Sequence, residues 1–159
     1  TVFGLNVAQE PEGPLALPGS YQVRLTVDGA TYTRPLKLVM DPRVLVPKTD
    51  LEAQFALQIK IYRALVQASR ALDEIAAYRL TPSASQPEKL KAIQEIEPAG
   101  ERTTAASKTS LSSMRGALAQ ITVELDSADA APTSQETAAA EKSLADLMQL
   151  LSEWGAIKK

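Results

Sequence analysis

The sequence predicts an α+β protein in which a β-hairpin is followed by an antiparallel bundle of three to four helices. Two observations carry this prediction. Residues 21–40 alternate apolar and polar side chains around an Asp-Gly pair, which is the pattern of two half-buried strands joined by a tight turn. Beyond residue 48, apolar residues recur every three or four positions, which is the period of amphipathic helices.

The composition argues against several classes of function. The 159 residues are enough for one compact core or two small subdomains. A formal net charge of -2 gives no electrostatic reason to bind nucleic acid or an anionic membrane. The chain has no Cys and no His, which removes disulfides, thiol nucleophiles, imidazole bases and the usual zinc sites. No apolar run approaches the ~20 residues of a membrane-spanning helix. We therefore expect neither nucleic acid nor a membrane as a partner.

The hairpin is the clearest β signal in the chain. Its first strand covers residues 21–27, and Asp28-Gly29 is a preferred pair for a two-residue type I′ turn. The return strand covers residues 30–40. This turn fixes the register, which pairs Leu25 with Tyr32 and Tyr21 with Leu36.

The predicted sheet is thin. Pro35 has no N–H to donate, so we expect its strand to be an edge or to contain a bulge there. Even with a third strand over residues 1–7, so few strands are marginal alone. Either helices cover the apolar face, or further strands of a sandwich lie upstream in a longer protein. The chain begins with Thr1 rather than Met, and we favour the second alternative.

The longest helix is predicted over residues 51–80. Thr49 and Glu52 have the spacing of a capping box, which predicts Thr49 as the N-cap. The apolar residues form two adjacent stripes: Leu51, Phe55, Ile59, Tyr62 and Val66, then Leu57, Ile61, Leu65, Ala68, Leu72 and Ile75. So wide an apolar face predicts contacts with two neighbours.

Three further helices are predicted. A short one near residues 86–97 opens with a capping box at Ser85 and Glu88 and turns Leu90, Ile93 and Ile96 inward. Residues 101–110 are either a loop or the frayed start of the next helix. That helix shows a strict three-four spacing in Leu111, Met114, Leu118, Ile121 and Leu125. The last helix opens with Thr133 and Glu136 and carries the stripe Ala140, Leu144, Leu147, Leu151 and Trp154. Short connections make these helices antiparallel neighbours.

The sequence predicts no catalytic, cofactor-binding or metal-binding residues. Asp73 and Glu74 are adjacent, so on a helix their side chains diverge, and we interpret them as solvated. Glu95 and Glu97 are interpreted in the same way. Asp126 is three residues from Asp129, and this pair is either a site for a hard cation or ordinary loop polarity. Without His, no Ser has a conventional base for nucleophilic catalysis.

Trp154 is the one residue with a predicted contact role. On the apolar stripe of the last helix it is either a core or interface anchor or a platform for a ligand. Tyr21 and Tyr32 share the apolar face of the hairpin, where packing is a better explanation than stacking on a sugar. We expect no cofactor.

Several segments resemble a known bacterial family. They are LPGSYQVRLTVDG from Leu17, YTRPL from Tyr32, MDPRV from Met40, DLEAQF from Asp50 and SADAAPT from Ser127. These motifs are similar to the C-terminal end of large secreted bacterial β-propeller proteins with BNR/sortilin-like repeats, which are often labelled glycosyl hydrolases. In that family an immunoglobulin-like strand set precedes helices. The resemblance therefore implies that residues 1–45 are a hairpin from a partial immunoglobulin-like sheet and residues 46–159 a helical bundle.

The resemblance also implies a function and a location. The family's catalytic residues would lie in propeller loops that this chain lacks, so none carries over and we do not expect an enzyme. We expect a non-catalytic C-terminal structural or interaction module of a larger secreted or periplasmic protein. Its partner would be its own upstream propeller domain or another protein. The alternatives are an accessory module that binds carbohydrate or another ligand, and a standalone helical oligomerisation protein. The sequence leaves the oligomeric state open.

Overall fold

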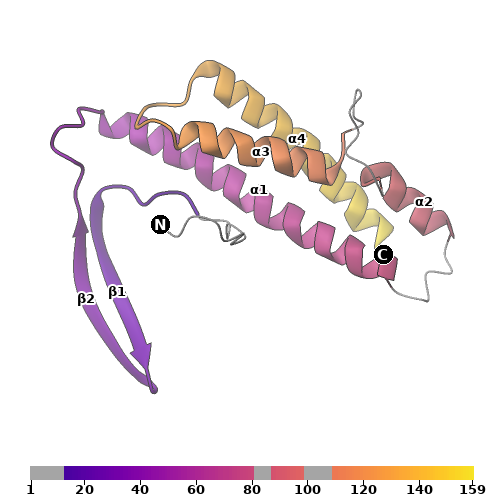
Figure 1. Cartoon of the computed structure of the whole chain (residues 1–159), viewed down its shortest axis with the longest axis horizontal. Coiled ribbons are helices and arrows are strands. Elements are labelled where there is room, and N and C mark those ends of the chain that lie inside the picture. The colour runs from indigo at the N-terminus through magenta and orange to yellow at the C-terminus, as the bar shows by residue number, and fades with distance from the viewer. Residues whose placement is uncertain (1–12, 81–86, 99–108) are drawn as a thin grey trace, which may run out of the picture.

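The computed structural model describes residues 13–80, 87–98 and 109–159. Within these ranges, a two-stranded antiparallel hairpin is followed by four helices (Figure 1). This order confirms the predicted α+β fold. The strand predicted over residues 1–7, the cap predicted at Ser85 and most of the connector over residues 101–110 lie outside the described residues.

The hairpin has the predicted register. Strand β1 (Gly19–Val27) pairs with β2 (Ala30–Leu38), and Leu25 lies opposite Tyr32. The turn residues have positive φ angles, 50° at Asp28 and 80° at Gly29, as a type I′ turn requires. The pairing is continuous through Pro35, so β2 is an unbulged edge strand at that position.

Helix α1 (Lys48–Leu80) begins earlier than predicted. Thr49 is not its N-cap, because the helix already includes Lys48. The backbone N–H of Asp50 donates to the carbonyl of Pro47 at 3.0 Å, which places the start of the helix at the proline. Glu52 has no part in a capping box and forms an ion pair with Lys48, one turn earlier, at 3.0 Å.

Two other helix starts show complete capping boxes. Helix α4 (Ser134–Ile157) has Thr133 as its N-cap, with reciprocal hydrogen bonds to Glu136, as predicted. Helix α3 (Leu111–Leu125) is capped by Ser110, whose partner is Ser113. This second box was not predicted, because the third helical residue is Ser rather than Glu or Gln.

The core lies between three long helices. Helix α1 packs against α3 and α4, which also pack against each other, and α2 (Pro87–Ile96) packs against α4. Figure 1 shows α3 running antiparallel to both α1 and α4, with α2 at the end where α1 and α4 finish. The largest fully buried side chains come from all four helices: Ile61, Ile75, Ile93, Leu111, Leu118 and Leu147.

The two predicted stripes of α1 have different environments. The stripe containing Ile61 and Ile75 is in the core. Along the other stripe Phe55 and Tyr62 are half-buried, and Val66 is exposed. The segment that precedes β1 runs beside this second stripe, because a Cβ at Gly13 would lie 3.9 Å from the Tyr62 ring. Within the described ranges, no helix has the length and apolarity to cross a membrane.

Candidate functional site

The hairpin presents one continuous apolar surface. The register places six large side chains on the same side of the two strands, and each is between 39% and 58% exposed. We call these residues the hairpin apolar face: Tyr21, Val23, Leu25, Val27, Tyr32 and Leu36. Arg34, opposite Val23, is the one charged residue on the same side of the two strands. The reverse side is polar except for Pro35: Ser20, Gln22, Arg24, Thr26, Thr31, Thr33 and Lys37.

Among the described residues, the hairpin is anchored only at its base. Tyr21 donates its hydroxyl hydrogen to the carbonyl of Leu17 at 2.6 Å, which ties β1 to the segment before it. Leu38 and Met40 are half-buried where the chain turns toward α1. Beyond this base the strands project away from the helices (Figure 1), and every residue from Ser20 to Lys37 is exposed. An exposed apolar surface of this kind is typical of a docking site.

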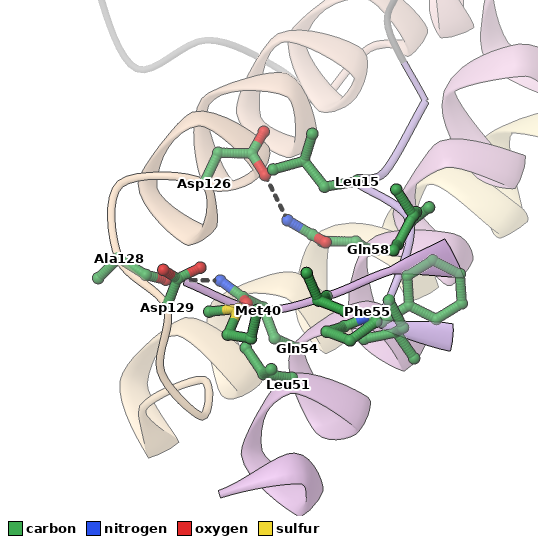
Figure 2. Close-up of a pocket in the computed structure, with 14 residues that line it drawn as sticks. Leu15, Met40, Leu51, Gln54, Phe55, Gln58, Asp126, Ala128 and Asp129 are labelled. Carbon is green, nitrogen blue, oxygen red and sulfur yellow. Dashed lines mark hydrogen bonds between the residues drawn. The ribbon is translucent and has the colours of Figure 1, made fainter. Parts of the chain in front are cut away.

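A pocket lies where the base of the hairpin meets the bundle. Figure 2 shows its walls, which come from the segments before and after the hairpin, from the first turns of α1 and from the α3–α4 connector. We call it the junction pocket; its volume is about 220 Å³. Most of its lining is apolar, including Leu15, Met40 and Phe55, and the polar part includes Asp126 and Asp129.

Two glutamines of α1 hold the connector in place beside this pocket. Gln54 donates from Nε2 to the carbonyl of Ala128 at 2.8 Å and also to that of Leu125. One turn later, Gln58 donates from Nε2 to Oδ1 of Asp126 at 2.6 Å, and its side chain is buried. The bond to Leu125 satisfies a carbonyl group left free in the last turn of α3, and the other two bonds fix the connector that follows it. Neither contact was predicted from the sequence, although a polar side chain inside an apolar helical stripe is a signal of such a contact.

Asp126 has a hydrogen-bond partner in the structure, Gln58 of α1. Its carboxylate accepts from Gln58, and Asp129 is exposed at the pocket. Hard cations such as Ca²⁺ take about six to eight oxygen ligands. Across the described residues, no group of three or more acidic side chains is arranged to hold a metal ion.

Trp154 lies in the core of the bundle. Its side chain is 4% exposed, and Nε1 donates to Oε2 of Glu74 at 2.8 Å. Lys158 donates to the same oxygen at 3.2 Å. The bond from Trp154, and then the bond from Lys158, lower the pKa of Glu74. Trp154 therefore anchors α4 to α1, and a ligand contact at this residue stays a prediction.

Glu97 is not the surface residue that the sequence suggested. It is buried, and Oε2 accepts from the backbone N–H of Ser112 at 2.9 Å, in the first turn of α3. Arg79 of α1 donates to its carbonyl. A carboxylate at this position is stabilised by the unpaired N–H groups of the helix start. Glu97 therefore ties together α1, the end of α2 and α3.

Comparison with known proteins does not assign the site. No protein-family model matches the sequence, and no curated protein or solved structure shows a significant match. The hairpin apolar face and the junction pocket are thus the two surfaces from which a function can be argued.

Proposed function

We propose that this chain is a non-catalytic structural and interaction module of a larger secreted β-propeller protein. In this proposal the hairpin apolar face docks on the protein's own upstream propeller domain or on another protein partner. The observation that carries it is the exposure of the six side chains of this face, whose reverse side is mostly polar. Such an amphipathic hairpin has the pattern of a sheet with one face packed and one face in water.

The size of the face favours a partner that is linked to the chain. Nine-residue strands extend about 30 Å, and two of them are about 10 Å wide. That area is well below the roughly 800 Å² per partner of a standard interface between separate proteins. A domain in the same polypeptide is present at a high effective concentration, so a small face is sufficient. Packing of two sheets about 10 Å apart is the arrangement that such a face fits.

The context of the module comes from the family resemblance. The motifs within Leu17–Val44 cover the whole hairpin and its exit, and the SADAAPT motif covers the α3–α4 connector. In this proposal those motifs place the chain after a propeller in a secreted or periplasmic protein. The immunoglobulin-like character of the sheet belongs to the proposal too, with the remaining strands supplied by the docked partner.

The first test is to read the gene upstream of the part that encodes this chain. We expect the reading frame upstream of Thr1 to encode a signal peptide and propeller blades. A frame that opens within a few residues of Thr1 would overturn the propeller context and would favour a standalone helical protein.

The second test uses the protein region encoded upstream, purified and mixed with this chain. Leu25→Asp places a charge at the centre of the hairpin apolar face, and we expect it to abolish binding measured by calorimetry. Thr31→Asp places the same charge on the reverse side, on β2, and is the matched control, which should bind like the wild type. Equal binding by both variants would contradict docking through the apolar face.

A second candidate function is supported by the junction pocket. Its apolar walls and carboxylates are suited to a small ligand that carries hydrogen-bond donors, such as a sugar. This would make the chain a ligand-binding accessory module. Titration with a range of oligosaccharides should then shift the NMR signals of Phe55 and Gln58, and Asp129→Asn should weaken binding. Unchanged spectra across the range would rule out this alternative.

A further inference from the structure

The two edges of the hairpin differ in their ability to accept another strand. In an antiparallel pair, hydrogen-bonded pairs alternate with pairs whose backbone N–H and C=O groups point outward. A two-residue turn is closed by a hydrogen bond between its flanking residues, here Val27 and Ala30. Counting from this pair, the outward groups of β1 belong to Ser20, Gln22, Arg24 and Thr26, and those of β2 belong to Thr31, Thr33, Pro35 and Lys37.

The outer edge of β2 is interrupted in the middle. Pro35 occupies an outward position, opposite Gln22, and has no N–H to offer a neighbouring strand. Two residues earlier, the carbonyl of Thr33 already accepts from Nη1 of Arg34 at 3.1 Å. A proline is one of the devices by which proteins block an edge strand against pairing. A strand added to β2 would lose the backbone contact at Pro35 and would share the carbonyl of Thr33 with Arg34.

The outer edge of β1, which we call the β1 edge, has no such block. Its four outward residues are all non-proline, so each presents a backbone donor and a backbone acceptor. No hydrogen bond between described residues uses these backbone groups. From Ser20 to Thr26 the edge extends about 20 Å, which matches a partner strand of about seven residues.

The side chains around the β1 edge define the chemistry of the partner. On one side lie Val23 and Leu25 of the hairpin apolar face, which an added strand would extend with apolar residues. On the other side lies Arg24. The two strands contain three basic residues, Arg24, Arg34 and Lys37, and no acidic residue, although the whole chain has a net charge of -2. An acidic strand is therefore complementary to the hairpin.

We propose that the β1 edge binds an amphipathic β-strand of a partner, in which apolar residues alternate with acidic ones. This inference rests on the proposed docking function and specifies how the docked sheet is joined. Main-chain hydrogen bonds to the β1 edge provide the affinity, and the alternate side chains provide the specificity. The added strand pairs with β1, so β2 remains the outer strand of the enlarged sheet.

A second copy of this chain is a poorer occupant of the edge. Antiparallel pairing of β1 with its own copy brings two copies of Arg24 onto the same face of one sheet. Like charges on neighbouring strands are destabilising. It also brings together two hairpins that are both rich in basic residues.

The test uses the full chain and a seven-residue acetylated peptide, Thr-Val-Glu-Val-Glu-Val-Thr, followed by NMR. We expect millimolar peptide to shift the backbone amides of Ser20, Gln22, Arg24 and Thr26. Gln22→Pro removes one outward N–H from the β1 edge without breaking the ladder, as Pro35 does on the other strand. It should weaken binding about tenfold. Thr33→Pro makes the same change on the outer edge of β2 without removing a charge and should bind as the wild type does.

Other outcomes would overturn the assignment. Shifts at the outward amides of β2, equal binding by Gln22→Pro and the wild type, or no binding at millimolar peptide would exclude the β1 edge. Equal binding of a peptide with Lys in place of Glu would exclude the acidic partner. Shifts at β1 that depend on protein concentration alone would assign the edge to a second copy. If Leu25→Asp abolishes docking of the upstream region and Gln22→Pro does not, docking stands and pairing at the edge is wrong.

Discussion

The hairpin and the helical bundle are both amphipathic, but in the described part of the chain only the bundle buries its apolar residues. Core residues of the bundle such as Leu118 and Leu147 are 0% exposed, whereas Leu25 and Tyr32 of the hairpin are 58% and 57% exposed. A hairpin of two strands is marginal alone, while three packed helices can form a core. The difference teaches that an amphipathic pattern identifies the face to be buried and leaves open which partner covers it.

The sharpest contrast is expected from truncation of a core side chain. Leu118→Ala removes a fully buried side chain between α3 and its neighbours, and its cost is about 2–5 kcal/mol of unfolding free energy. Urea denaturation followed by circular dichroism measures this value. A cost below about 1 kcal/mol would show that the bundle core is less tightly packed than its burial indicates.

A smaller effect is expected at the caps. Thr133→Ala removes the N-cap of α4 and should cost about 1 kcal/mol. Thr49→Ala is the matched control, since Thr49 lies inside α1 and caps nothing there. Thermal unfolding of the two variants distinguishes the two positions. Equal destabilisation would restore Thr49 as the cap of α1.

Acid should destabilise the bundle in part through Glu74. Its pKa is lowered in the folded protein by the hydrogen bonds from Trp154 and Lys158. A carboxyl group of this kind stabilises the fold above its unfolded pKa, near 4.3, and the contribution is lost as pH falls through the folded pKa. Glu74→Gln should therefore flatten the fall in melting temperature below pH 4.3. A fall in melting temperature at low pH as steep as that of the wild type would contradict this role.

The smallest effect is expected at the hairpin apolar face. Leu25→Ala should change the unfolding free energy of the isolated chain by no more than about 0.5 kcal/mol, because the side chain is already exposed. The same substitution should weaken docking of the upstream protein region. A loss of stability comparable to that of Leu118→Ala would show that the hairpin packs within the chain.

Much of the fold could be predicted from local patterns. The Asp28-Gly29 pair fixes the turn, the period of two fixes the face of each strand, and the three-four spacing over residues 111–125 identifies the inner side of α3. These features depend on residues close together in the chain. For the same reason the capping box at Thr133 was predicted correctly.

The parts that could not be predicted depend on contacts between distant segments. Gln58 reaches Asp126, and Glu97 reaches the first turn of α3, only after the helices have packed. Thr49 failed as a cap because the helix already begins at Lys48, with its first hydrogen bond to the carbonyl of Pro47, although the spacing to Glu52 fits a box. The junction pocket joins segments from four parts of the chain, and no local pattern signals it.

The position of Trp154 determines which structural change the intrinsic tryptophan fluorescence of this protein reports. Trp154 is the chain's single tryptophan, and its indole is hydrogen-bonded to Glu74. Glu74 lies 26 residues after Lys48, the first residue of α1, so the two are about 39 Å apart along the helix axis. The intrinsic emission of Trp154 will therefore follow melting of the bundle and remain constant when the hairpin is occupied. A tryptophan introduced by Tyr32→Trp, in a Trp154→Phe background, would move the chromophore to the strands and report their occupancy directly.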